Sequence, residues 1–220
     1  MRSIFILVFF FLHLQAIAQA TTFPFEIQLK ADSIIGFNGL HSFAFGQLND
    51  RVVLIGGRQD GIHARQPFNA FASSQNNTSL QLLDLTTNQF WSAPINSLSS
   101  ALQEQLQSTN MNFFQDGNEL IIAGGYAFSN AANDHITFPN LTRIDLNGLM
   151  HAIIDDQPIS PYFEQITDQR FAVTGGNLTK IGGQYYLVGG HRFDGRYNPM
   201  NMYNLYIMFF NYFERLYYLK

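Results

Sequence analysis

The chain contains no cysteine and few charged residues, and each scarcity excludes a class of protein. Without cysteine, its 220 residues cannot form a disulfide scaffold, a thiol nucleophile or a Cys-ligated metal site. Charged residues are 13% of the sequence, about half the ~25% of an ordinary soluble protein, and the formal net charge is -4. This balance offers no basic surface to nucleic acid, so we expect no nucleic-acid partner. Hydrophobic residues reach 46% and aromatic residues 15%, which excludes an intrinsically disordered chain.

The first twenty residues have the three parts of a secretory signal peptide. A short basic start at residues 1–3 precedes an apolar stretch at residues 4–14, and Ala18-Gln19-Ala20 supplies the cleavage pattern. We therefore expect cleavage after Ala20 and export to the extracellular space, the periplasm or the cell surface. The apolar stretch is shorter than the ~20 residues of a membrane-spanning helix, so no transmembrane anchor is expected. The alternative is a buried N-terminal helix or strand.

An apolar run that ends in a glycine doublet occurs three times, and we number the repeats by these doublets. The doublets are Gly56-Gly57, Gly124-Gly125 and Gly189-Gly190. Their spacing is 68 residues (from 56 to 124) and then 65 residues (from 124 to 189). Each run follows a tight-turn signal, at residues 49–50, 116–117 and 182–183. Such turns connect hairpins because they need positive φ, so each repeat is predicted to begin with a β-hairpin whose second strand is buried.

Further strands are expected after the doublets. Repeat 1 continues with an apolar run at residues 80–84, a turn at 86–88 and then Phe90-Trp91, and repeat 2 has a comparable run at 141–146. Four strands per repeat, arranged radially, form the blade of a β-propeller. Residues 100–103 fit a capping box, and Leu98, Leu102 and Leu106 recur at helical spacing, which predicts a short helix between blades.

This pattern resembles the kelch repeat, in which an apolar strand ends in a glycine doublet and is followed by an Asp and a Trp. The matching residues are Gly56, Gly57, Asp84 and Trp91 in repeat 1, Gly124, Gly125 and Asp145 in repeat 2, and Gly189 and Gly190 in repeat 3. Ala152 stands where the second Trp would fall. The resemblance covers about residues 37–200 and implies an all-β, kelch-type β-propeller with about three four-stranded blades over residues 21–200. Kelch units run ~50 residues, so the longer repeats imply long loops. A β-sandwich with glycine turns is the alternative.

Charged residues gather in the loops that follow the first and third doublets. The candidate ligand-binding residues are Arg58, Asp60, His63, Arg65, His191, Arg192, Asp194 and Arg196. Arg and His at these positions would suit carboxylate, phosphate or sugar hydroxyl groups through forked hydrogen bonds. The alternative is structural, with Asp-Gly forming each turn and the neighbouring Arg holding the carboxylate. The middle loop lacks charge directly after its doublet.

The resemblance also limits the function classes. Kelch propellers include protein-binding scaffolds, carbohydrate-binding domains, copper oxidases of the galactose oxidase type and sialic acid mutarotases. The copper oxidases need a Cys cross-linked to a Tyr, so the absence of Cys excludes that activity. No cofactor, metal site or catalytic residue is predicted. Our leading hypothesis is a secreted module that binds a carbohydrate or protein ligand; a mutarotase-like or epimerase-like enzyme and a non-functional truncated fragment are the alternatives.

Three remaining features are assigned no binding role. Asp155, Asp156 and Glu164 lie near prolines and fit a solvated connection, and His41 fits a hydrogen-bonded structural residue. The aromatic-rich tail at residues 201–220 departs from the repeat pattern. We hypothesise that it marks a frameshift or truncation of a longer propeller; the alternative is a C-terminal strand or helix that packs on the open edge.

Overall fold

The computed structural model describes residues 25–30, 33–61, 67–198 and 216–219. The chain divides into two compact units, Met1–Ser33 and Ile34–Lys220. In the first unit, the described residues form no helix or strand. All elements discussed below belong to the second unit. The signal-peptide prediction for residues 1–20 lies outside the described residues, as do His63 and Arg65.

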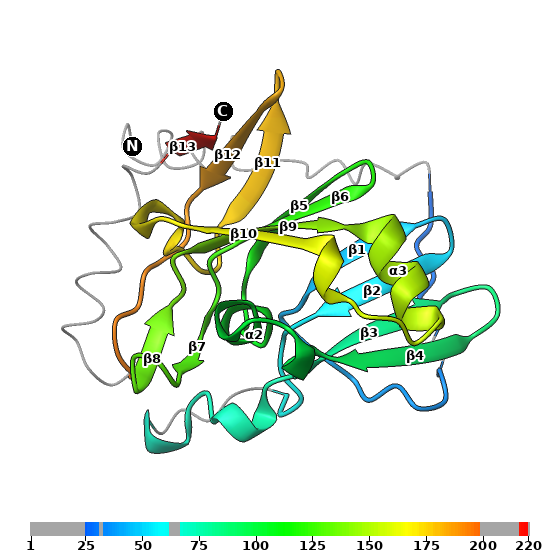
Figure 1. Ribbon diagram of the computed structural model, residues 1–220, viewed down its shortest axis with the longest axis horizontal. Helices are drawn as coiled ribbons and strands as arrows, with labels where there is room; N and C mark the ends of the chain where they lie inside the picture. The colour runs from blue at the N-terminus through cyan, green and yellow to red at the C-terminus, as the bar shows by residue number, and fades with distance from the viewer. Residues whose placement is uncertain (1–24, 31–32, 62–66, 199–215, 220) are drawn as a thin grey trace, which may run out of the picture. The chain divides into compact units, whose positions relative to one another are not determined.

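Repeat 1 forms a four-stranded antiparallel sheet in sequence order (Figure 1). Its strands are β1 (Ala44–Leu48), β2 (Arg51–Ile55), β3 (Ser79–Asp84) and β4 (Gln89–Pro94). The hairpin predicted at residues 49–50 is confirmed, and Asn49 has a φ of 52° in its turn. The fully buried second strand is confirmed at its C-terminal half, since Val53 and Ile55 are 0% exposed.

Repeat 2 forms a second four-stranded antiparallel sheet, in the order β5-β6-β9-β10. Its strands are β5 (Asn112–Asp116), β6 (Glu119–Ala123), β9 (Asn140–Asp145) and β10 (Phe163–Thr167). Where the resemblance puts the second Trp position, at Ala152, the chain instead forms helix α3 (Leu146–Ile154). Ala152 is buried within this helix, and the fourth strand begins only at Phe163. The four-stranded arrangement is therefore kept, with a helix inserted before its last strand.

Repeat 3 forms a smaller, three-stranded antiparallel sheet. Strand β11 (Asn177–Ile181) and strand β12 (Gln184–Val188) form the predicted hairpin, and β13 (Leu216–Leu219) pairs with β12. This arrangement matches the alternative in which the tail adds a strand to the open edge. Residues 199–215 of the tail lie outside the described residues.

The connections contain the remaining elements. The short helix predicted between repeats 1 and 2 is confirmed as α2 (Ser100–Leu106), whose N-cap is Ser99, one residue before the expected cap; its hydroxyl accepts the Leu102 amide at 3.4 Å. The long loop of repeat 1 contains two 3₁₀ turns, η1 (Pro67–Asn69) and η2 (Ser73–Gln75). The sequence did not predict the hairpin of β7 (Tyr126–Ser129) and β8 (Asp134–Thr137), which fills the loop after the second doublet.

The largest hydrophobic core lies between the sheets of repeats 1 and 2. Residues on one face of β1, β2 and β3 pack against residues of β6, β9 and α3, and Trp91 packs against this core half-buried. A smaller cluster of four buried residues joins repeats 2 and 3: Ile121, Val173, Leu178 and Leu187. The described part of the chain is thus mostly β, and within it the sheets do not close into a ring.

Candidate functional site

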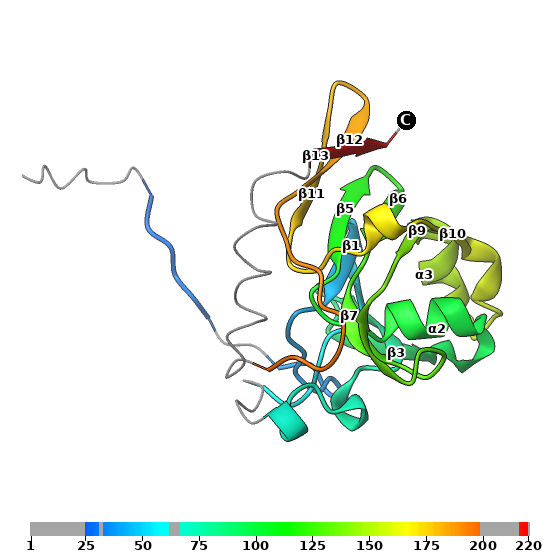
Figure 2. The ribbon, with the colours of Figure 1, turned by 90° about the vertical axis from the view of Figure 1, so that its left-hand side faces the viewer.

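The three loops after the doublets are held in the same way. In each repeat, the residue after the doublet pairs through two backbone hydrogen bonds with a residue at the start of the inner strand. The pairs are His41 with Arg58, Thr109 with Tyr126, and Thr174 with His191, at donor–acceptor distances of 2.8 to 3.1 Å. Equivalent positions therefore point the three loops toward one end of the sheets (Figure 2).

Arg58 is buried, and its side chain makes its contacts within the protein. Its side chain is 1% exposed, and its guanidinium donates to both carboxylate oxygens of Asp60, at 2.9 and 2.6 Å. It also donates to Asn76 Oδ1 at 2.9 Å and to the carbonyl of Ala72 at 3.2 Å, and it lies over the ring of Phe71 at 5.3 Å. These contacts match the structural alternative considered for the Asp-Gly turn.

Asp60 is the accessible end of this pair. Its side chain is 21% exposed, and His41 Nε2 lies 3.4 Å from its Oδ1. The hydrogen bonds from Arg58, together with its charge, lower the pKa of Asp60 below the usual value of 3.8. The carboxylate is therefore ionised at neutral pH and anchors the first turn of the loop.

Aromatic rings join the three loops into one cluster. Phe71 of the first loop packs edge-on against Tyr126 of the second, with ring centroids 5.1 Å apart. Phe193 and Tyr197 of the third loop pack against the same two residues. The Tyr126 hydroxyl donates to the carbonyl of Gly195 at 3.0 Å and accepts the Tyr197 amide at 2.7 Å. We call Phe71, Tyr126, Phe193 and Tyr197 the aromatic platform, since they connect loops from three repeats.

The hairpin β7–β8 lies between the loops of repeats 1 and 3. His135 in β8 is 2% exposed, and its Nε2 lies 3.0 Å from the carbonyl of Phe71, which assigns the proton to that nitrogen. Burial lowers the pKa of His135 below 6.5, so the imidazole is neutral at pH 7. On the other side, Phe193 accepts the Thr137 amide at 3.0 Å and Gly195 donates to the His135 carbonyl at 2.8 Å.

The charged residues of the third loop lie at the surface beside this platform. Arg192 and Asp194 form an ion pair at 3.2 Å, and their side chains are 35% and 70% exposed. Arg192 also donates to Gln169 Oε1 at 3.1 Å, and Arg196 donates to the carbonyl of Phe68 at 3.1 Å, which reaches across to the first loop. The structure thus places Arg192, Asp194 and Arg196 close together at the surface of the third loop.

His191 was a candidate from the sequence, whereas the residues of the aromatic platform were not. His191 lies half-buried, with its ring centroid 5.9 Å from that of Phe193. The sequence indicated charged residues as candidates but not the four aromatic residues of the platform. One signal was available for Tyr126, which aligns with Arg58 and His191 directly after the doublets.

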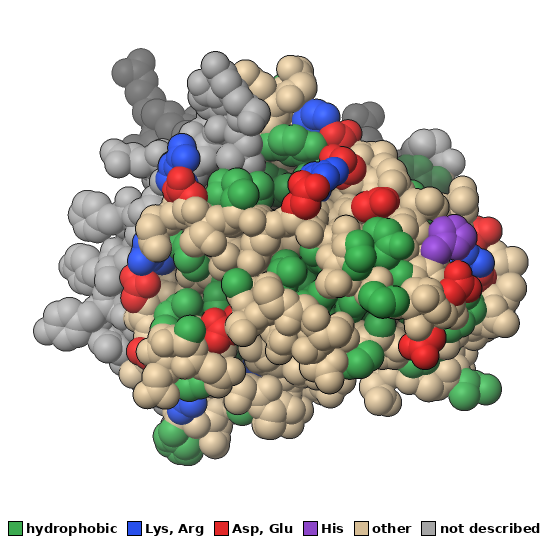
Figure 3. All heavy atoms as spheres, viewed as in Figure 1, with side chains coloured by type: hydrophobic (Ala, Val, Ile, Leu, Met, Phe, Trp, Pro, Cys, Tyr) green, Lys and Arg blue, Asp and Glu red, His purple; other side chains and the backbone are tan. Residues whose placement is uncertain are grey.

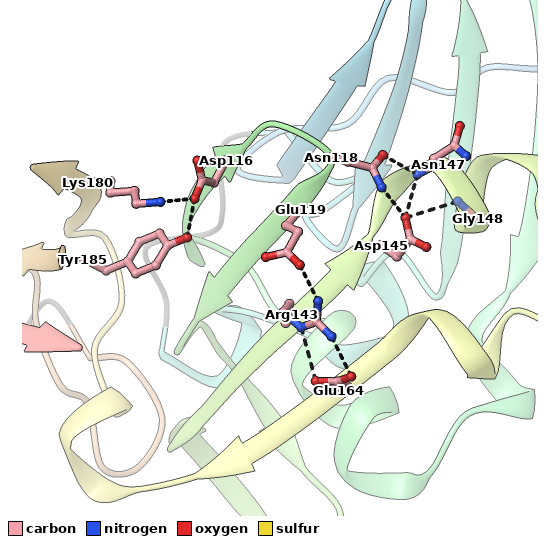
Figure 4. Close-up of polar contacts among 10 residues, drawn as sticks. All are labelled: Asp116, Asn118, Glu119, Arg143, Asp145, Asn147, Gly148, Glu164, Lys180 and Tyr185. Atoms are coloured by element: carbon pink, nitrogen blue, oxygen red, sulfur yellow. Dashed lines mark hydrogen bonds and ion pairs between the residues drawn. The ribbon is translucent and has the colours of Figure 1, made fainter. Parts of the chain in front are cut away.

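The two kelch-pattern Asp residues have structural contacts. The Asp84 carboxylate accepts the amides of Thr86 and Thr87, at 3.1 and 2.9 Å, and so holds the turn before β4. Asp145 accepts the amides of Asn147 and Gly148, at 3.2 and 3.3 Å, which caps α3 (Figure 4). Both residues stand at the end of the third strand of their sheet, so the same side chain closes a turn in one repeat and starts a helix in the other.

Other charged groups form ion pairs between neighbouring strands of the sheets. Arg143 of β9 lies between Glu119 and Glu164 of the neighbouring strands (Figure 4). Glu164 was expected in a solvated connection; its side chain is 71% exposed, but the residue lies in β10 and pairs with Arg143. Asp116 accepts hydrogen bonds from Lys180 and from the Tyr185 hydroxyl, which links repeat 2 to repeat 3. Both clusters hold neighbouring strands together through pairs of opposite charge.

Two cavities lie near the repeat junctions. One, of about 460 Å³, lies between the inner strands β1, β5 and β11 and is lined by Phe45, Phe113, Phe114 and Leu178 among others. A second cavity, of about 700 Å³, lies between α2 and the β7–β8 turn. Charged side chains are sparse over the middle of the face shown in Figure 3 and more frequent toward its margins.

The described residues contain neither a metal-binding cluster nor a membrane-spanning helix. No group of three or more His, Asp or Glu side chains in this part of the chain could hold a metal ion. None of the described helices is long and apolar enough to cross a membrane.

Comparison with known proteins finds similarity to solved structures but no match to a family model or to a curated protein. Among solved structures, that of YjhT is similar over 73% of this chain and 41% of its own chain, with 14% sequence identity and a TM-score of 0.45. The chain thus spans less than half the length of that protein. At this level, the similarity indicates neither a family nor a function.

Proposed function

We propose that the chain is part of an exported, kelch-type β-propeller that binds a carbohydrate through the loops after its glycine doublets. Two features support the propeller. The sheets of repeats 1 and 2 each contain four antiparallel strands whose sequence order is also their spatial order. All six doublet glycines have positive φ, between 64° and 100°, so each apolar strand ends in the same left-handed turn.

The observation that carries the binding role is the exposed Arg192–Asp194 pair beside the aromatic platform. A guanidinium offers forked donors and a carboxylate offers acceptors, which together match the vicinal hydroxyl groups of a sugar. The platform beneath them joins three loops through ring contacts and backbone hydrogen bonds. A surface held in this way loses little conformational entropy on binding, which favours affinity.

The predicted binding residues divide into two roles in this proposal. Arg192, Asp194 and Arg196 contact the ligand. Arg58 and Asp60 shape the first loop, because Arg58 is buried and uses its donors within the protein. His63 and Arg65 complete the first loop and remain candidates for ligand contact.

A glycan array with the full chain tests the proposal. The double variant Arg192→Ala/Arg196→Ala should bind its best glycan roughly tenfold or more weakly, because charge-assisted hydrogen bonds are each worth about 1.5–3 kcal/mol. Arg51→Ala is the matched control, since Arg51 is also an ion-paired arginine, 39% exposed, but lies in the β1–β2 hairpin. We expect its binding to equal that of the parent. Glycan binding that is absent from the parent, or equal in the double variant, contradicts a carbohydrate site at these loops; a protein ligand would then be the next hypothesis.

A further inference from the structure

The same backbone hydrogen bond joins repeat 1 to repeat 2 and repeat 2 to repeat 3. The amide of Gly57, the second glycine of its doublet, donates to the carbonyl of Ser108 at 2.9 Å. One repeat further on, the amide of Gly125 donates to the carbonyl of Val173 at 3.2 Å. The donor thus belongs to a doublet, and the acceptor belongs to the segment just before the inner strand of the next repeat.

A second bond recurs at the same junctions with the opposite polarity. The amide of Asn110 donates to the carbonyl of Ser42 at 3.0 Å, and the amide of Gly175 donates to the carbonyl of Asn110 at 2.9 Å. Here the donor belongs to the later repeat. Each junction therefore has one donor and one acceptor on either side.

Both ends of this series are open. The Gly190 amide, equivalent to the first two donors, has no acceptor in the described part of the chain, and the equivalent carbonyl of Leu40 has no donor there. Among the described residues, the second series likewise leaves the Ser42 amide and the Gly175 carbonyl without partners. Repeat 3 thus ends in one donor and one acceptor, and repeat 1 begins with their complements.

At repeat 3, none of the described residues occupies the space that a following repeat fills at the first two doublets. A Cβ at Gly56 would lie 2.9 Å from the carbonyl oxygen of Leu106, and one at Gly124 would lie 2.8 Å from that of Phe171. Gly189 has a φ of +68°, the same as Gly124, but no heavy atom of the described part of the chain lies within 4 Å of where its Cβ would be. The first two doublets thus pack against the next repeat, whereas no described residue packs against the third doublet at Gly189.

Side-chain exposure follows the same pattern. Ile55 and Ala123 end the second strands of repeats 1 and 2 and are 0% and 1% exposed. Their equivalent in repeat 3, Val188, is 47% exposed, and Ile181 on the same face of the hairpin is 64% exposed. Val188 is thus exposed at the position where the other two repeats bury an apolar side chain against a neighbour.

We propose that the doublet end of repeat 3 binds residues 38–42 of repeat 1 in a second copy of this chain. The Gly190 amide then donates to the Leu40 carbonyl, and the Ser42 amide donates to the Gly175 carbonyl. Leu40 is half-buried in one copy, whereas its equivalents Ser108 and Val173 are buried at 0% and 2%. The contact would bury Leu40 against the partner as those residues are buried within the chain.

A second copy is the occupant that the chain itself specifies, because one chain carries both complementary halves of the contact. Such a head-to-tail interface closes into a ring when the rotation between copies allows it. Two copies would place six repeats around one ring, within the 4 to 8 blades of closed propellers. This inference goes beyond the proposed ligand binding, since it concerns the repeat junctions and not the loops.

Sedimentation analysis of the full chain across a range of concentrations tests the proposal. We expect the parent to associate into dimers, and Val188→Arg and Leu40→Arg each to weaken association at least tenfold. A mixture of the two variants should recover association, because one intact Val188 face then meets one intact Leu40 segment. Ile166→Arg is the matched control: Ile166 is 58% exposed on β10, away from the proposed contact, and its variant should associate like the parent.

Circular dichroism of each variant separates loss of association from loss of folding. If Leu40→Arg does not fold, Asn38→Arg replaces it, because the Asn38 side chain is exposed. A parent that stays monomeric at every concentration overturns the proposal. So does an oligomer that neither variant weakens, or two folded variants whose mixture does not recover association.

Discussion

At the scale of single residues, two glycines with the same φ allow the cost of backbone strain to be distinguished from the cost of steric overlap. Gly124 and Gly189 both have a φ of +68°, but a Cβ would overlap backbone atoms only at Gly124. We expect Gly189→Ala to lower the free energy of unfolding by about 1–2 kcal/mol, the cost of a left-handed L-residue. Gly124→Ala should cost several kcal/mol more or prevent folding. Urea denaturation of both variants, at concentrations where the chain is monomeric, measures the difference; equal losses would contradict the packing assigned to Gly124.

His135 gives a residue-scale prediction for pH. Burial lowers its pKa in the folded chain below the 6.5 of the unfolded chain. As the pH falls through 6.5, the unfolded chain takes up a proton that the folded chain does not, so the free energy of unfolding decreases. The carboxylates with lowered pKa values, such as Asp60, lose their stabilising effect mainly below about pH 5, so the change between pH 7 and pH 5 lies mostly outside their range.

Urea midpoints at pH 7 and pH 5 check this expectation. The parent midpoint should fall between these values, and the fall should be smaller in His135→Gln, which keeps a donor for the Phe71 carbonyl without a titrating group. Phe128→Leu, a non-titrating change beside the His135 ring, is the control. Its urea midpoint should fall between pH 7 and pH 5 by as much as that of the parent. If the midpoint of His135→Gln falls by as much as that of the parent, the pH dependence arises from another group.

At the scale of elements, Asp145 decides where β9 ends and α3 begins. Its carboxylate accepts two amides of the first turn of α3 and a hydrogen bond from Asn118 Nδ2 at 2.5 Å. Asp145→Ala should lower the free energy of unfolding by about 0.5–2 kcal/mol, the usual cost of losing an N-cap. Asp155→Ala at the other end of α3 is the control and should change stability by less than ~0.5 kcal/mol, because surface changes are usually small. Denaturation midpoints give both values, and a larger loss for Asp155→Ala would contradict the capping role.

The predictability of individual elements depended on whether the signal was local. The three hairpins followed from turn residues that favour positive φ beside apolar runs, and α2 followed from a cap and the spacing of Leu98, Leu102 and Leu106. Helix α3 was missed because residues 141–146 already read as a strand and its apolar positions continue that run. Hairpin β7–β8 was missed because its main support is tertiary, namely hydrogen bonds to the loops of repeats 1 and 3.

At the scale of the whole second unit, stability should decrease from repeat 1 to repeat 3. The core between repeats 1 and 2 contains many fully buried side chains, whereas four buried residues join repeats 2 and 3. Strand β12 ends in the exposed Val188, where β2 and β6 end in buried residues. Few buried contacts allow local opening, so hydrogen-exchange protection in β12 should be at least roughly tenfold lower than in β2 and β6. Equal protection in all three strands, measured in the monomer, would contradict this order.

The sequence by itself determined the repeat, its hairpins and the presence of Arg192, Asp194 and Arg196 in one loop. These features depend on neighbouring residues along the chain, namely turn residues that favour positive φ and apolar runs that form buried strands. The sequence also marked Arg58, but not its role. Only the tertiary structure decided that Arg58 is buried against Asp60 and Asn76, since both contacts depend on how a long loop folds back. The aromatic platform likewise needed three loops from distant repeats to meet. The two repeated bonds that join the repeats are made by backbone amides and carbonyls, which carry no side-chain signature, so their open ends at Gly190 and Leu40 were visible only in the structure.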